Sequence, residues 1–143
     1  MSFKFEKLDV WQRALSYVDL TYDIAAQLPR NEEYNLKSQI VRAATSVALN
    51  IAEGSTGQTD AEQARFLGMA IRSLIETVAC QHIISRRNLL SDATLLRQAY
   101  RDAEELMAML YKMRTTIAPD QAWLREGPVQ YSTDVEQADK REQ

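Results

Sequence analysis

The sequence of 143 residues has little of several residue types that mark particular classes of protein. It contains 4 Gly and 3 Pro, and their scarcity predicts a few long elements and argues against a β-rich or loop-rich fold. The single cysteine, Cys80, cannot form a disulfide within the chain and lies in an apolar run. These features predict a buried thiol in a reducing compartment.

Long apolar runs are also missing. No window approaches ~18 uninterrupted apolar residues, so no membrane-spanning helix is expected. The first residues, "MSFKFEKLDVW", have no apolar stretch typical of a signal peptide. We therefore expect a cytoplasmic protein that does not use a membrane.

An excess of positive charge is absent as well. The 17 basic and 20 acidic residues give a net charge of −3, which is not typical of a domain held to nucleic acid by bulk charge. This balance neither requires nor forbids a polyanionic partner. Hydrophobic residues make up 45% of the chain, which is enough for the core of one ordinary domain.

Residues for catalysis or metal binding are scarce. A carboxylate-bridged metal pair in a helical bundle needs Glu-x-x-His motifs on two helices, and the one histidine, His82, has no carboxylate at helical spacing. Cys80 and His82 are two residues apart and point to different sides of a helix, so a nucleophile pair is not expected. We predict no enzyme activity, no catalytic residue, no metal and no cofactor. A hydrolase or metal enzyme is a third hypothesis that would need a bound metal.

Four amphipathic segments account for most of the chain. The first, about 9–28, has a predicted core face with neighbours beside it, and the second runs from an N-cap at Asn31 to Gly54 as the residue after its C-terminus. The third begins with a capping box at Thr59, and the fourth follows a cap at Ser91 or Asp92 and ends before Pro119. The predicted core face of the first comprises Leu8, Trp11, Leu15, Val18, Tyr22 and Ala25, and its neighbours are Val10, Ala14, Tyr17, Ile24 and Leu28.

Short links force consecutive helices to lie antiparallel. The sequence therefore predicts an all-α fold, an antiparallel up-down-up-down four-helix bundle, over residues 1–118. The remaining residues, 119–143, form a C-terminal tail. Because the tail holds four large apolar groups, we expect part of 119–131 to dock on the bundle or a neighbour and 132–143 to be flexible. The four groups are Trp123, Leu124, Val129 and Tyr131.

The stretch "GSTGQ", residues 54–58, allows two interpretations. It could cradle a phosphate at a helix N-terminus, or it could be a corner between two helices. It lacks the lysine and the preceding strand of a P-loop, and turn chemistry explains every residue type in it. The corner is the favoured interpretation.

A polar stripe on the second segment needs another explanation. Its members recur at steps of three and four, about 120° from the core stripe, and Glu76 of the third segment lies on a related polar side. A solvated face with ion pairs is one interpretation. Short Ser, Asn and Ala side chains favour a subunit interface or buried polar stripe in a homo-oligomer. The candidate residues are Gln39, Arg42, Ser46, Asn50, Glu53 and Glu76.

Four arginines near the link between the last two segments form a candidate basic patch. They are Arg86, Arg87, Arg97 and Arg101. Ordinary helix capping and surface charge also explain these arginines, and this interpretation is favoured over a binding patch. Symmetric assembly would multiply any such patch, which keeps nucleic-acid binding open as an alternative.

Three blocks, "FEKLDVWQRA", "LP-x-x-E-x-Y-x-L-x-x-Q-I-x-R-A-A-x-S-V-x-x-N-I-A-E-G" and "FLGMAIRSLIE", resemble the four-helix bundle protein family, also called the 23S rRNA intervening-sequence protein family. The resemblance covers about residues 5–117. It implies an antiparallel bundle assembled as a ring-like homopentamer without catalytic activity. A similar, strongly basic pentamer serves diversity-generating retroelements and associates with nucleic acid. Here Val41, Gln58 and Thr59 replace residues that are commonly basic, which weakens that transfer.

Two functional hypotheses follow. The first is a non-enzymatic, oligomeric scaffold or adaptor, a homopentamer whose biological process is unknown. The alternative is an RNA- or DNA-binding accessory protein that acts through basic surfaces of the oligomeric ring.

Overall fold

The computed structural model describes residues 3–57 and 59–119, and all the regular secondary structure in this part of the chain is helical. A 3-10 helix, η1 (Lys4–Lys7), precedes α1 (Asp9–Gln27), and a second, η2 (Arg30–Glu32), precedes α2 (Leu36–Gly54). The two longest helices follow, α3 (Asp60–Arg86) and α4 (Thr94–Ile117). The predicted all-α fold with four main helices is confirmed.

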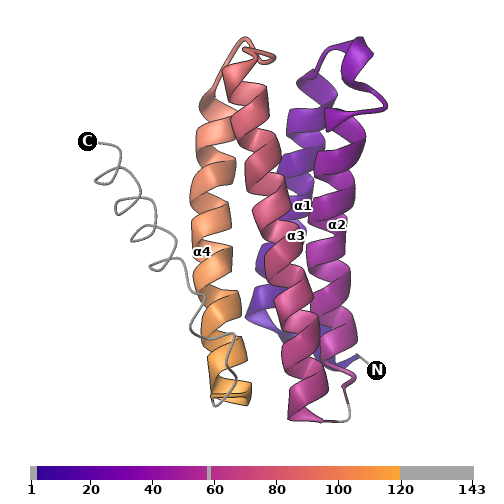
Figure 1. The fold of residues 1–143 in the computed structure, drawn as a ribbon, viewed down its shortest axis with the longest axis vertical. Helices are drawn as coiled ribbons and strands as arrows, with labels where there is room; N and C mark the ends of the chain where they lie inside the picture. The colour runs from indigo at the N-terminus through magenta and orange to yellow at the C-terminus, as the bar shows by residue number, and fades with distance from the viewer. Residues whose placement is uncertain (1–2, 58, 120–143) are drawn as a thin grey trace, which may run out of the picture.

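The four helices stand side by side, and the chain reverses direction at each link (Figure 1). Contacts between α2 and α3 show this reversal in detail. Ser46 contacts Ser73, and Gly54 lies against Phe66, so the residue number rises along α2 while it falls along α3. Each helix packs mainly against two neighbours, in the cyclic order α1, α2, α3, α4.

The predicted core face of α1 is only partly buried. Ala25 is buried, and Trp11 and Val18 are half-buried and pack against the core. Leu15 is 37% exposed and Tyr22 is 55% exposed, while the neighbouring face is buried and includes Ala14, Tyr17 and Ile24. Helix α1 carries two apolar stripes roughly 100° apart, and periodicity alone does not say which of them faces the bundle. We call the second one the α1 outer stripe; it comprises Trp11, Leu15, Val18 and Tyr22.

The start of α2 also differs from the prediction. Asn31 does not cap the helix, because it lies within η2, which begins directly after Pro29. Helix α2 begins five residues after Asn31, at Leu36. Leu28 and Leu36 are both buried and anchor the two ends of this link on the core.

Gly54 is the last residue of α2, so its predicted place as the residue after the C-terminus is wrong. No glycine in the described ranges has a positive φ angle. A Cβ atom at Gly54 would lie 3.1 Å from the Cβ of Phe66, so this glycine allows α2 and α3 to approach closely.

The predicted N-cap of α3 is confirmed, whereas the predicted N-cap of α4 is not. The Glu62 backbone N–H donates to the Thr59 hydroxyl at 3.1 Å, which confirms Thr59 as the cap of α3. The Asp92 carboxylate accepts from the N–H of Thr94 at 2.9 Å and from its hydroxyl at 2.6 Å, and these bonds lower the pKa of Asp92. The predicted cap at Ser91 or Asp92 is therefore wrong, because the N-cap of α4 is Ala93, which makes no side-chain bond, and Asp92 lies one residue before it.

A chain of buried hydrogen bonds links α1 to α3. The Thr77 hydroxyl donates to the Leu74 carbonyl at 2.6 Å, so it accepts from the Tyr17 hydroxyl at 2.7 Å. The Tyr17 oxygen then accepts from Nε2 of Gln81 at 2.7 Å. These directions fix the Gln81 amide and leave its Oε1 buried without a partner. An unpartnered buried acceptor costs about 1–3 kcal/mol.

The bundle continues to Ile117, and Ala118 after it is buried. The predicted docking of part of 119–131 and the predicted flexibility of 132–143 fall, apart from Pro119, outside the described residues.

Candidate functional site

The corner between α2 and α3 is a hydrogen-bonded turn. The backbone N–H groups of Ser55, Thr56 and Gly57 all donate to carbonyls of the preceding turn, at 3.1–3.2 Å. The side chains of Ser55 and Thr56 donate back to the chain in the same way. Because these donors are already used, the corner does not offer them to a phosphate.

The polar stripe of α2 divides into two parts. Asn50 is buried and Ser46 is half-buried, whereas Gln39, Arg42 and Glu53 are exposed. The Ser73 hydroxyl donates to Oγ of Ser46 at 2.9 Å, and the Asn50 amide donates to the Ser46 carbonyl at 2.9 Å and to its Oγ at 3.1 Å. The inner residues therefore join α2 to α3 within one chain.

Two of the outer residues, Arg42 and Glu53, are charged, and neither makes an ion pair within residues 3–57 and 59–119. Arg42 donates only to Ser38, at 3.4 Å. Since Ser46 lies opposite Ser73 in an antiparallel pair, Arg42 lies at the level of Glu76, and Glu53 lies near the level of Arg65. Charges of opposite sign thus border the seam between α2 and α3 at two levels.

Exposed apolar side chains accompany these charges. Leu49 of α2 is 55% exposed, and Met69 of α3 is also exposed.

The orientation of α1 follows from one ion pair, which Arg13 forms with Glu105 of α4. Leu15 is two residues further on, about 200° around α1, and therefore lies on the side nearer α2.

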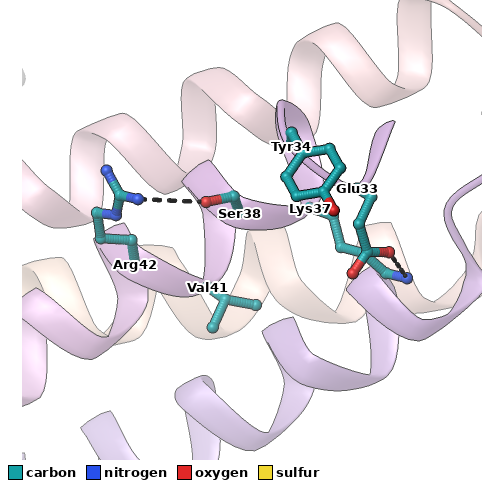
Figure 2. Close-up of a pocket in the computed structure, with 6 residues that line it drawn as sticks. All are labelled: Glu33, Tyr34, Lys37, Ser38, Val41 and Arg42. Carbon is teal, nitrogen blue, oxygen red and sulfur yellow. Dashed lines mark hydrogen bonds and ion pairs between the residues drawn. The ribbon is translucent and has the colours of Figure 1, made fainter. Parts of the chain in front are cut away.

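The α1 outer stripe therefore lies on the same side of the bundle as the outer part of α2. We call this area the α1–α2 surface, and it comprises the α1 outer stripe with Tyr34, Val41 and Leu49. Figure 2 shows one end of it, a shallow depression lined by Tyr34, Val41, Arg42 and the ion pair between Lys37 and Glu33. Tyr34 is 96% exposed, which is extreme for an aromatic side chain.

The four arginines of the candidate basic patch are all exposed. Arg97 and Arg101 lie on the same side of α4 and line a depression between α3 and α4, whereas Arg86 and Arg87 lie at the end of α3 and do not line it. The guanidinium groups of Arg97 and Arg101 donate to Thr94 at 3.4 Å and to Gln98 at 3.0 Å. The structure therefore brings two of the four arginines into one site.

Cys80 and His82 do not form a catalytic pair. Cys80 is buried, and burial, with a smaller contribution from the nearby Glu76, raises the pKa of its thiol. A raised pKa disfavours the reactive thiolate. His82 is exposed and meets the ring of Tyr100 edge-on, with 6.1 Å between ring centroids. Across the described ranges no group of three His, Cys, Asp or Glu side chains is placed to hold a metal ion.

The described helices include none that is both long and apolar enough to span a bilayer.

Sequence reasoning missed two features, one on the α1–α2 surface and one in the core. The α1 outer stripe was assigned to the core, and the buried chain from Tyr17 to Gln81 was not anticipated. Thr77 and Gln81 are four residues apart on the apolar side of α3, and this pair of buried polar residues was the available signal.

Comparison with known proteins adds a family to this geometry. No curated protein matches the chain. A crystal structure of a protein of unknown function from the S23 ribosomal protein family of Bacteroides thetaiotaomicron is similar, with a TM-score of 0.67 and 21% sequence identity. The match covers 73% of this chain and 97% of that one, and at this identity it supports the fold alone. The model of the 23S rRNA-intervening sequence protein family matches residues 6–112, so the chain belongs to that family.

Proposed function

We propose that this protein is a non-enzymatic scaffold or adaptor of the cytoplasm that works as a homo-oligomer. The observation that supports it best is the outer part of α2, where exposed Leu49 lies among the charges of Arg42 and Glu53, which make no ion pair in the described chain. In an isolated chain this surface adds no stability, because its apolar groups are in water and its charges form no ion pairs. A second copy would cover the apolar groups and pair the charges.

A closed ring requires two different, complementary surfaces on each subunit. We assign one to the α1–α2 surface, which is mainly apolar. The other is the seam between α2 and α3, where Met69 is exposed between Arg65 and Glu76. Gln39, Arg42 and Glu53 border both surfaces and would contact the neighbour, while Ser46 and Asn50 support α2 from inside. The family resemblance implies five subunits, so we propose a homopentamer.

Native mass spectrometry tests this assembly. We expect a species with the mass of five 16.3 kDa chains, and the same species by light scattering in solution. A monomer at every concentration up to about 100 μM would contradict the scaffold proposal, because physiological assembly at such weak affinity is not expected.

The alternative function, an RNA- or DNA-binding accessory protein, has one specific observation in its favour. Arg97 and Arg101 converge on one depression without an ion pair in the described residues, beside exposed Tyr100. Arginine and aromatic side chains together are typical of single-strand binding. Arg86 and Arg87 lie at the same end of the bundle and would contact the phosphate backbone.

Filter binding with a single-stranded RNA across a salt series tests this alternative. If it holds, affinity falls steeply as salt rises, because each neutralised phosphate releases counterions. Absence of binding at about 50 mM salt, where nonspecific electrostatic binding is strong, would count against it.

A further inference from the structure

The residue whose side-chain oxygen has no partner in the described chain, Gln81, borders a depression between α3 and α4. Gln81 is 4% exposed, and its Nε2 is held by the Tyr17 hydroxyl at 2.7 Å, so its Oε1 faces away from that bond. The same residue lines the depression between the end of α3 and the start of α4. The cost of leaving this acceptor unpaired is recovered if a bound molecule supplies a donor.

The rest of the depression has a mixed and specific chemistry. We call it the α3–α4 pocket; its polar and aromatic lining comprises Gln81, His82, Ser85, Arg97, Tyr100 and Arg101. Two arginines offer forked donors that suit a phosphate or carboxylate. The exposed Tyr100 ring offers a face for stacking and meets His82 edge-on. Arg97 and Arg101 are one turn apart and serve the same side of the pocket.

We propose that the α3–α4 pocket binds a nucleoside phosphate. The phosphate lies between Arg97 and Arg101, the base stacks on Tyr100, and an N–H group of the base donates to Oε1 of Gln81. The oxygen is covered in the free protein, so side chains that line the pocket have to shift to admit the base.

The competing ligand classes leave part of the pocket unused. A simple anion such as inorganic phosphate would use the arginines but not the buried acceptor or the ring. An apolar ligand would leave both guanidinium groups and the acceptor unpaired. A free nucleotide and the terminal nucleotide of an RNA strand share the chemistry that fits, and experiment distinguishes these two sources. The site lies within one chain and does not depend on the proposed assembly.

Isothermal titration of the full chain with AMP, GMP, CMP, UMP and inorganic phosphate tests the proposal. We expect at least one nucleotide to bind at least about tenfold more tightly than inorganic phosphate, because stacking and the Gln81 bond add to the phosphate contacts. A short RNA with and without a 5′-phosphate gives the second source. Preference for the phosphorylated RNA over the free nucleotide identifies an RNA end, and the reverse identifies a free nucleotide.

Variants locate the site. Arg97→Gln with Arg101→Gln should raise the Kd of the nucleotide at least about tenfold, since both charged contacts are lost. Arg30→Gln is the matched control, and its Kd should not change. Arg30 is exposed and belongs to η2 in the link between α1 and α2, which lies at the same end of the bundle as the link between α3 and α4 (Figure 1). Gln81→Met should narrow the preference for the nucleotide over inorganic phosphate, because the bond to Oε1 is lost while stacking on Tyr100 remains, with folding checked by circular dichroism.

Three results would overturn the site. One is that none of the four nucleotides binds at about 1 mM, a concentration that detects even weak ligands. Another is equal affinity for nucleotides and inorganic phosphate. The third is a Kd that the double arginine variant leaves unchanged while Arg30→Gln raises it.

Discussion

Replacing Leu49 with arginine is expected to separate the proposed oligomer into single chains. Leu49 is 55% exposed in one chain, and in the proposed assembly it lies against a neighbour. Burying a guanidinium without a partner at the centre of an interface is strongly unfavourable. We expect the dissociation constant to rise at least ~100-fold, equivalent to about 2.7 kcal/mol, as measured by native mass spectrometry and sedimentation.

Ile75→Arg is the matched control for this change. Ile75 is 48% exposed on α3, but at helical spacing it lies about 160° around the helix from Ser73, away from the seam with α2. Its substitution adds the same charge to a similarly exposed apolar site, and the oligomer should survive. If both variants dissociate equally, or neither does, the assignment of α2 to the interface is wrong. Asn50→Arg would not serve, because Asn50 is buried within the chain and its loss would disturb the fold itself.

Raising the pH from 10 to 12 is expected to remove up to about 2.7 kcal/mol of stability through Tyr17 alone. Burial raises the pKa of Tyr17 from 10.0 to about 12, against the smaller opposing effect of its bonds to Thr77 and Gln81. Between these two values the unfolded chain has lost the phenolic proton and the folded chain retains it. The stabilising contribution is therefore complete below pH 10 and is lost as the pH rises towards 12.

Tyr17→Phe isolates this contribution. The variant should be less stable than the natural chain by about 1–3 kcal/mol at pH 8, because Thr77 and Gln81 each lose a buried partner. This difference in unfolding free energy, measured by denaturant titration at several pH values, should shrink between pH 10 and pH 12. Cys80, whose pKa burial also raises, is present in both proteins and cancels. A difference that stays constant across this range would show that Tyr17 does not titrate as described.

The start of α3 could be predicted from sequence because it follows a local rule. A threonine before Asp60 with an acid in the first turn specifies the start of α3 whatever the surrounding fold, and the structure obeys it. The start of α2 could not be read in the same way. Asn31 has the residue type of a cap, but Leu28 and Leu36 are both drawn into the core, and the link between them folds as a 3-10 turn. Tertiary burial thus overrode a local propensity.

The candidate surface was only partly visible for a related reason. Spacing correctly placed Ser46 and Asn50 on one side of α2, but it could not show that Ser73 of the same chain meets them. Spacing likewise identified four arginines near one link, whereas only the packing of α3 on α4 shows that Arg97 and Arg101 share a depression. Contacts between distant segments depend on helix rotation, which a one-dimensional pattern does not contain.

The two apolar stripes of α1 have a consequence for how the bundle finds a single arrangement. Turning α1 by roughly 100° about its own axis would exchange one stripe for the other, and hydrophobic burial alone would discriminate weakly between the two rotational states. Only one of them brings the Tyr17 hydroxyl to Thr77 and Gln81. The three polar groups therefore select one rotational state of α1. In that state Leu15 and Tyr22 stay exposed, where the proposed assembly would cover them.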